Sequence, residues 1–186
     1  MSDASLVFIA AQTTTGSDKE IVDLAIVAEN GTTMFHTAFN PEEIENLPDG
    51  YSAGDVAPSP RFRGVALQVL GYLTGPVVAG HNTQLSMKFV NRFLRRSFQE
   101  DGYDPEEIVK MMARINLLYV DSLTLAWEQL PALKERTLED VCNYLRISYK
   151  PKHSALEDAR AAHTIYETLL RANAWQRWWW KRRAPR

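Results

Sequence analysis

The fold is decided by residues 6–39, LVFIAAQTTTGSDKEIVDLAIVAENGTTMFHTAF. This segment begins with an apolar run, residues 6–12, that has the length of a buried strand and ends at three threonines. A second apolar run spans 21–27, and Asn30-Gly31 is a strong hairpin signal before a third strand at 33–39. The segment therefore predicts three antiparallel strands at the start of the domain.

Outward from this segment, the apolar spacing alternates between helix and strand. We expect helices at 65–73, around 89–94, at about 121–130, at 137–146 and at 155–169, with strands at 77–80 and 115–120. Three strands followed by alternating helices and strands predict an α/β domain with a mixed five-stranded sheet flanked by helices. We place this domain at residues 1–170, followed by a Trp/Arg-rich tail at 171–186.

The composition is that of an ordinary globular domain. Of 186 residues, 45% are hydrophobic and 24% are charged, which argues against a coiled coil, a collagen or a disordered chain. No apolar run approaches the roughly 20 residues that span a bilayer, and the first residues lack a basic signal region, so we expect a cytoplasmic protein. The one cysteine, Cys142, has no partner for an intrachain disulfide and is expected in the core.

The net charge of −2 conceals an acidic body and a basic tail. Residues 171–186 contain six basic and no acidic side chains, and without these six the chain has 15 basic against 23 acidic side chains, a charge of −8. The body should repel bare phosphate backbones, whereas the tail should attract an anionic partner.

Three separated segments resemble motifs of a known superfamily. They are residues 10–16, AAQTTTG, at the end of the first strand; residues 79–86, AGHNTQLS, at the end of the fourth; and residues 153–159, HSALEDA, at the start of the last helix. In this order they resemble the DEDDh 3′–5′ exonucleases, the superfamily of the DNA polymerase III proofreading subunit and RNase T. The resemblance implies a ribonuclease H-like fold and phosphodiester cleavage with two divalent ions held by four carboxylates.

The same resemblance implies that three of the four carboxylates are replaced. Two alignments of the first motif are open, and the first two carboxylate positions hold either Ala11 and Thr13 or, with one inserted threonine, Ala10 and Gln12. The third and fourth positions hold Ser86 and Asp158. One carboxylate should not hold two hard cations, so no metal and no cofactor is expected; Mg²⁺ or Mn²⁺ would bind only if residual activity exists.

The resemblance assigns His153 the role of general base, which has little to act on without a metal-bound water. Alternatively, His153 is only part of the entrance to the last helix, with Asp158 in its first turn. Acids outside the motif positions that could rescue the site are Asp18, Asp121 and Glu157. Three changes spread over two motifs favour natural loss over engineering.

Three further features are candidates for binding. His81 and Asn82 are either a remnant nucleotide contact or a turn after a buried strand. A basic stripe on the following helix, near the former cleft, is either a phosphate contact or a solvated face, and consists of Lys88, Arg92, Arg95 and Arg96.

The tail combines indoles with cations, in Trp175, Arg177, Trp178, Trp179, Trp180, Lys181, Arg182 and Arg183. Such residues stack on unpaired bases, anchor at a membrane interface or bind a protein partner. Alternatively, Trp175 and Trp178 or Trp179 continue the apolar face of the last helix onto the domain.

These observations predict a non-catalytic pseudonuclease that acts by binding. Its partner is a protein in nucleic-acid processing, such as replication, repair or conjugation, or single-stranded nucleic acid. The alternative is a residual metal-dependent 3′–5′ exonuclease.

Overall fold

The computed structural model describes residues 5–42, 44–116, 118–149 and 154–182. Its centre is a five-stranded sheet in the order β3-β2-β1-β4-β5. The strands are β1 (Leu6–Thr13), β2 (Ile21–Ala28), β3 (Thr33–Ala38), β4 (Val77–Gly80) and β5 (Tyr119–Asp121). β2 runs antiparallel to both β1 and β3, whereas β4 runs parallel to both β1 and β5. The mixed five-stranded sheet and the three opening antiparallel strands are confirmed.

The fifth strand is shorter than the expected 115–120. Ile115 follows a turn in which its backbone N–H donates to the carbonyl of Met112, and it forms only an isolated bridge with Thr74. The side chain of Asn116 then accepts a hydrogen bond from the backbone N–H of Leu118. These local bonds bend the chain, so regular pairing begins only at Tyr119.

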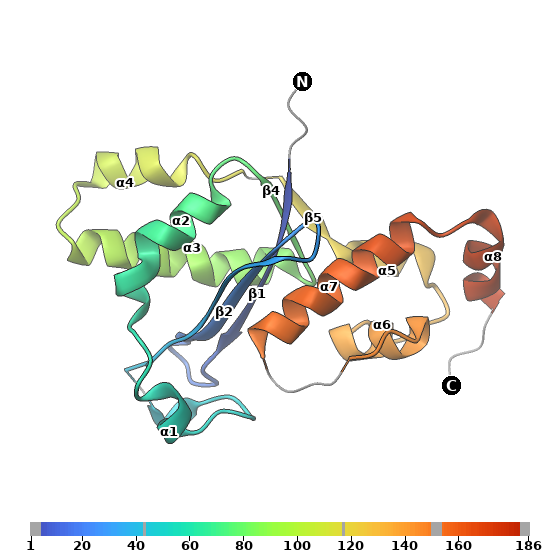
Figure 1. Ribbon diagram of the computed structural model, residues 1–186, viewed down its shortest axis with the longest axis horizontal. Coiled ribbons are helices and arrows are strands. Elements are labelled where there is room, and N and C mark those ends of the chain that lie inside the picture. The colour runs from blue at the N-terminus through green and yellow to red at the C-terminus, as the bar shows by residue number, and fades with distance from the viewer. Residues whose placement is uncertain (1–4, 43, 117, 150–153, 183–186) are drawn as a thin grey trace.

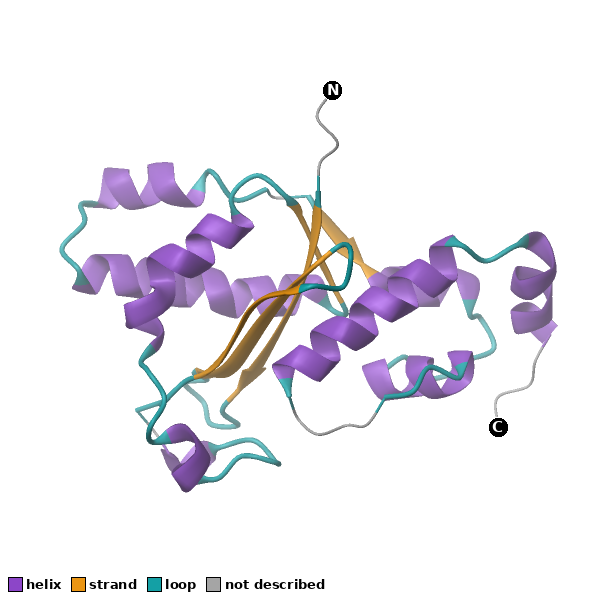
Figure 2. Ribbon diagram, in the orientation of Figure 1, coloured by secondary structure: helices purple, strands orange, loops and turns teal. Residues whose placement is uncertain are grey.

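Helices cover both faces of the sheet, as Figures 1 and 2 show. The first group is α2 (Ala66–Leu73), α3 (Thr83–Glu100) and α4 (Pro105–Met112). The segment between β3 and α2 contains the short α1 (Ala53–Val56) and 3-10 turns at Ile44–Asn46 and Phe62–Val65. The second group is α5 (Ser122–Gln129), α6 (Leu138–Leu145), α7 (Ala155–Leu170) and α8 (Ala174–Arg182).

The side chains of β1 alternate between two apolar cores, one on each face of the sheet. Val7 and Ile9 belong to the apolar core with α2 and α3, and Ala11 packs against it. Phe8 belongs to the core beneath α7, against which Ala10 packs. Successive side chains of a strand point to opposite faces, so every second residue of β1 faces α7.

Three helices were not expected from the periodicity, namely the short α1, α4 and α8. α4 starts at a capping box, in which Asp104 accepts backbone N–H bonds and Glu107 bonds back, with Pro105 in the first turn. α8 starts at a similar reciprocal pair between Asn173 and Gln176, each side chain accepting from the other's backbone N–H at 2.9 Å. Residues 174–182 of the tail therefore form a separate helix and do not continue α7.

The tail packs on the domain through an unexpected tryptophan. Trp180 is buried in the core with α5 and α6, and its carbonyl accepts a 2.7 Å hydrogen bond from the Tyr144 hydroxyl. Trp175, Trp178 and Trp179 are exposed, so the expectation that they extend the apolar face of α7 is wrong. The reason is that α7 ends at Leu170 and a separate helix starts at Ala174, so the tryptophans do not follow the helical repeat of α7.

Two other expectations from the sequence can be compared with the structure. Cys142 is buried in the core, as expected, and burial raises the pKa of its thiol to about 12. In the described part of the chain, none of the helices has both the length and the apolar character needed to cross a bilayer.

Candidate functional site

The two alignments of the first motif place different side chains beside Asp158. Gln12 lies on the α7 face of β1, and its Nε2 donates a 2.5 Å hydrogen bond to Oδ2 of Asp158. Ala10 lies on the same face, whereas Ala11 packs against the core with α2 and α3. Only the alignment with Ala10 and Gln12 puts both positions on the face of Asp158.

Asp158 is held by neutral donors on both carboxylate oxygens. It lies in the first turn of α7, where Oδ1 accepts a 2.6 Å hydrogen bond from the Tyr149 hydroxyl and Oδ2 accepts the bond from Gln12. Burial and the bond to Asp158 raise the pKa of Tyr149 above its usual value, so this hydroxyl stays a donor. The motifs did not identify Tyr149, because its distance from Asp158 along the chain corresponds to no motif spacing.

A small cavity of about 180 Å³ marks the place where the motifs meet. Its lining contains one carboxylate and consists of Ala10, Ala11, His81, Asn82, Leu85, Ser86, Leu138 and Asp158. No group of three or more His, Cys, Asp or Glu side chains suited to a metal ion occurs among the described residues.

These residues do not fit a two-ion centre. Mg²⁺ and Mn²⁺ need several oxygen ligands with negative charge, and here an amide NH₂ points at the only carboxylate of the cavity lining. The positive end of that amide dipole occupies the side of Asp158 that a cation would need. No step of a reaction is therefore derived through a metal ion.

The three acids considered as replacements have other roles. Asp121 accepts hydrogen bonds from the backbone N–H groups of Asn82, Thr83 and Leu123, so it caps α5 and holds the turn between β4 and α3. Asp18 forms an ion pair with Arg92, and Glu157 pairs with Arg160 at 3.4 Å. None of the three belongs to the cavity lining.

His81 and Asn82 shape the turn at the end of β4. Both ring nitrogens of His81 have protein partners, the Ser122 hydroxyl at 3.0 Å and the Arg136 carbonyl at 2.8 Å. Burial lowers the pKa of His81, which keeps the ring neutral. Asn82 has a left-handed backbone with φ of 62°, a conformation that asparagine tolerates well. Their contacts favour the turn over the nucleotide contact.

The tight turn also depends on Gly80. A Cβ at this position would lie 2.7 Å from the carbonyl oxygen of Ile9, so any larger residue would push β4 away from β1. The second motif thus keeps the backbone geometry at the end of β4, although its carboxylate position holds Ser86.

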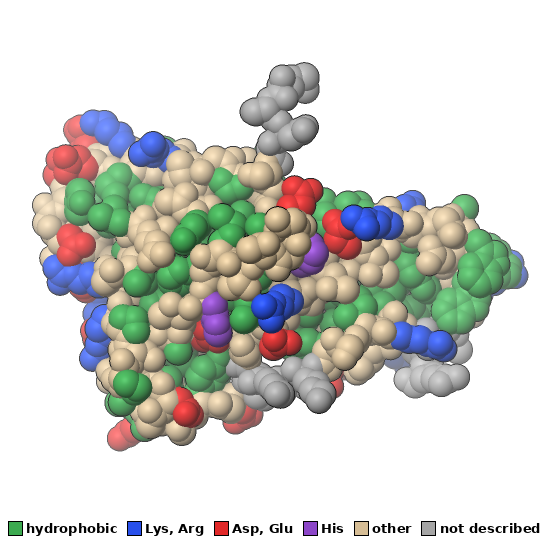
Figure 3. Space-filling model, in the orientation of Figure 1, with side chains coloured by type: hydrophobic (Ala, Val, Ile, Leu, Met, Phe, Trp, Pro, Cys, Tyr) green, Lys and Arg blue, Asp and Glu red, His purple; other side chains and the backbone are tan. Residues whose placement is uncertain are grey.

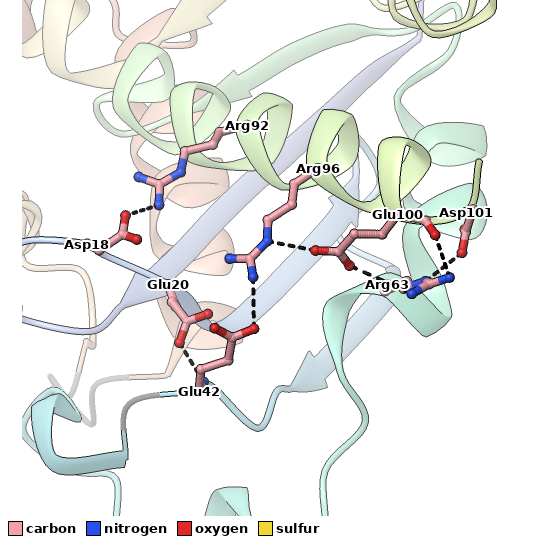
Figure 4. Close-up of polar contacts among 8 residues, drawn as sticks. All are labelled: Asp18, Glu20, Glu42, Arg63, Arg92, Arg96, Glu100 and Asp101. Carbon is pink, nitrogen blue, oxygen red and sulfur yellow. Dashed lines mark hydrogen bonds and ion pairs between the residues drawn. The ribbon is translucent and has the colours of Figure 1, made fainter. Parts of the chain in front are cut away.

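Half of the basic stripe on α3 is neutralised by carboxylates from other segments (Figure 4). Arg92 pairs with Asp18, and Arg96 lies 2.8 Å from both Glu42 and Glu100. Lys88 and Arg95 are exposed and form no ion pair within the described ranges. Two of the four cations of the stripe therefore belong to an ion-pair network.

The network extends to the end of α3. Arg63 lies 2.5 Å from Asp101 and 3.9 Å from Glu100, while the backbone N–H of Glu42 donates a 2.5 Å bond to Glu20 (Figure 4). It joins the β1–β2 loop and the acidic segment after β3 to the helix.

A buried carboxylate that the motifs did not single out lies below the start of α7. Asp23 of β2 is 2% exposed, and its Oδ2 accepts hydrogen bonds from the Tyr51 hydroxyl at 2.7 Å and the Ala155 backbone N–H at 2.9 Å. His36 of β3 lies 3.2 Å from Oδ1 of Asp23, which raises the pKa of the imidazole. An isolated aspartate within the apolar run of residues 21–27 was the available signal.

Two predicted site residues, His153 and Arg183, lie outside the described residues. The other tail residues form α8, where Arg177, Lys181 and Arg182 are exposed. α8 lies at the far end of the second helix group (Figure 1), and none of its residues belongs to the lining of the cavity.

Comparisons with known proteins find a family model and a relative that match most of this chain. The exonuclease family model RNase_T matches residues 13–166. The subunit epsilon of DNA polymerase III from Aquifex aeolicus (strain VF5) is 24% identical over 159 residues, which cover 81% of this chain and 72% of that protein.

Two solved structures are similar in fold. The apo structure of Exonuclease I has a TM-score of 0.63 and 14% identity over 94% of this chain, which spans 43% of that chain and so less than half of its length. The structure of the yeast NOT1 MIF4G domain co-crystallised with CAF1 has a TM-score of 0.60 and 12% identity, covering 90% of this chain and 79% of that one. The ribonuclease H-like α/β fold is thereby confirmed.

Proposed function

Because this chain belongs to the RNase_T exonuclease family and yet holds its one motif carboxylate with neutral donors, we propose that it is a pseudonuclease that acts by binding. The observation that carries the proposal is the hydrogen bond from Gln12 to Asp158. Two-ion cleavage needs charge at the positions of the attacking and leaving oxygens, and an amide, a methyl group and a hydroxyl at Gln12, Ala10 and Ser86 supply none.

We further propose that the partner is a protein of nucleic-acid processing. Ion pairs occupy Arg92 and Arg96, so two of the four cations that would contact a phosphate backbone are compensated. The acidic body adds repulsion toward a polyanion. The co-crystallised NOT1–CAF1 pair is a precedent for a protein complex in a structure similar in fold.

The direct test is a degradation assay with 5′-labelled single-stranded DNA and RNA in the presence of Mg²⁺ or Mn²⁺. The proposal predicts that no nucleotides are released from the 3′ end beyond the level of an Asp158→Asn variant. Metal-dependent release that disappears in Asp158→Asn would overturn the proposal and establish the alternative, a residual 3′–5′ exonuclease.

The choice between a protein partner and single-stranded nucleic acid is tested separately, by measuring the binding of a 20-nucleotide oligo-dT at two salt concentrations. Phosphate contacts weaken steeply with salt, since each released counterion contributes to the slope. Tight binding of oligo-dT that falls by about tenfold or more between 50 and 200 mM salt would identify single-stranded nucleic acid as the partner in place of a protein.

A further inference from the structure

We propose that α8 binds the interface of a membrane that contains anionic lipids. The contact surface, called here the α8 aromatic face, consists of Trp175, Trp178, Trp179 and Arg182. This surface lies outside the cavity of Asp158, so the inference goes beyond the proposed pseudonuclease function and does not depend on it.

The helix is fixed to the domain by the side opposite to these residues. Trp180 is 6% exposed and is held through the 2.7 Å bond from Tyr144 to its carbonyl. Trp175, Trp178 and Trp179 are 66%, 49% and 36% exposed. At 100° per residue these three side chains share one face with Arg182, so the fixed helix presents three indoles to the surroundings.

In the described part of the chain, no carboxylate forms an ion pair with the cations of α8. Arg177, Lys181 and Arg182 are exposed and take part in no ion pair there, and residues 171–186 contain no acid. The guanidinium carbon of Arg182 lies 4.3 Å from the centre of the Trp178 ring. Indoles beside unpaired cations match the headgroup region, where amphipathic rings and anionic phosphates occur together.

The shape of the surface favours a membrane over a nucleic-acid strand. α8 forms one end of the long axis of the molecule, and hydrophobic side chains gather at that end (Figures 1 and 3). A helix presents a convex ridge, whereas proteins hold single strands in a basic groove. Arg182 also covers one face of the Trp178 ring, which removes a stacking surface for a base.

The position of α8 at one end of the molecule also explains why the acidic body need not repel an anionic membrane. Exposed charges separated by more than about 8–10 Å are largely screened at physiological salt. A membrane that touches only the α8 aromatic face meets the end of the molecule opposite to the first helix group, so the acids of that group lie on the side away from the membrane (Figure 1).

The test is flotation of the full chain with vesicles of phosphatidylcholine alone or of phosphatidylcholine and phosphatidylglycerol at 3:1. We expect the bound fraction to be about tenfold higher with the anionic vesicles, together with a blue shift of tryptophan emission. The triple variant Trp175→Ala/Trp178→Ala/Trp179→Ala keeps the charges and Trp180, and should lose both signals.

A second variant, Arg177→Gln/Lys181→Gln/Arg182→Gln, should lose the preference for anionic vesicles. The matched control is Lys88→Gln/Arg95→Gln, which removes two exposed cations from α3 and should bind as the parent does. Thermal unfolding of every variant shows whether the domain still folds.

Two outcomes would overturn the inference. The first is equal vesicle binding by the parent and the folded α8 variants. The second is absence of vesicle binding, including the case in which oligo-dT binds and the α8 variants lose that binding. Nuclease activity dependent on Asp158 would contradict the proposed function and leave this result unaffected, so the two failures are distinguishable.

Discussion

The carboxylate of Asp23 on β2 accepts a hydrogen bond of 2.9 Å from the backbone N–H of Ala155, the first residue of α7. Ser154 is at the N-cap position of α7, but its side chain makes no capping bond. A side chain from the sheet thus supplies the acceptor that the helix end requires and fixes the start of the helix that carries Asp158.

Replacement of this carboxylate should destabilise the domain. Asp23→Ala removes the acceptor of the Ala155 backbone N–H, which is buried, and of the Tyr51 hydroxyl, which is partly buried. We expect the free energy of unfolding to fall by about 3 kcal/mol, measured by urea denaturation. Asp49→Ala, at an exposed position, is the control and should change it by less than about 0.5 kcal/mol. Equal effects of the two substitutions would contradict the assigned role of Asp23.

The pair of His36 and Asp23 should make stability depend on pH. Because Asp23 raises the pKa of His36, the protonated imidazole is favoured in the folded state. This contribution is fully present below the unfolded pKa of 6.5 and is lost as the pH rises through the higher folded pKa. His36→Gln should therefore lower the free energy of unfolding more at pH 5.5 than at pH 8.5. A difference between parent and variant that grows with pH would have the wrong sign.

Restored carboxylates should bind Mn²⁺ in one alignment only. Ala10→Asp/Gln12→Glu/Ser86→Asp places three acids on the face of Asp158, and calorimetry should detect binding at least about tenfold tighter than to the parent. Activity need not return, because two-ion geometry tolerates displacements of only about 0.5 Å.

The other alignment serves as the control for this experiment. Ala11→Asp/Thr13→Glu/Ser86→Asp puts a charge at a partly buried position that packs against the core with α2 and α3, and it should bind no better than the parent. If that variant fails to fold, Thr13→Glu/Ser86→Asp tests the same alignment without the acid at position 11. Tighter binding by either control than by the first triple variant would reverse the assignment.

The ion-pair network on α3 should contribute a small, salt-dependent stability. Arg96→Gln removes contacts with Glu42 and Glu100 that are partly exposed, so the loss should stay below about 1 kcal/mol at 50 mM NaCl and shrink at 500 mM. Arg95→Gln, next to it and without an ion pair in the described residues, should have no such salt dependence. Identical salt profiles for both variants would mean that Arg96 is not held by these carboxylates in solution.

Local patterns in the sequence were sufficient for most of the fold. The strands of residues 6–39, the turn at Asn30-Gly31 and the periodicity of α7 express preferences of neighbouring residues, which a linear pattern records directly. The missed helix α4 had a readable signal in its capping box and proline. Residue identity alone also showed that the second motif has Ser86 at its carboxylate position and that the third motif keeps Asp158.

The sheet favours one of the two alignments that the motif left open. Whether Ala10 and Gln12 or Ala11 and Thr13 stand at the carboxylate positions depends on which face of β1 meets α7, and one residue of register exchanges the two faces. The bond between Gln12 and Asp158 joins residues 146 positions apart, so no local pattern contains it.

Tertiary structure likewise decided which charged and aromatic side chains remain available. The sequence by itself determined that α3 carries four cations and that the tail carries four tryptophans. Only the packed chain showed that Asp18 and Glu42 reach Arg92 and Arg96, and that Trp180 is the buried indole. The physical reason is that ion pairing and burial are set by distances between segments, which depend on how the helices pack on the sheet and not on the residues next to them in the chain.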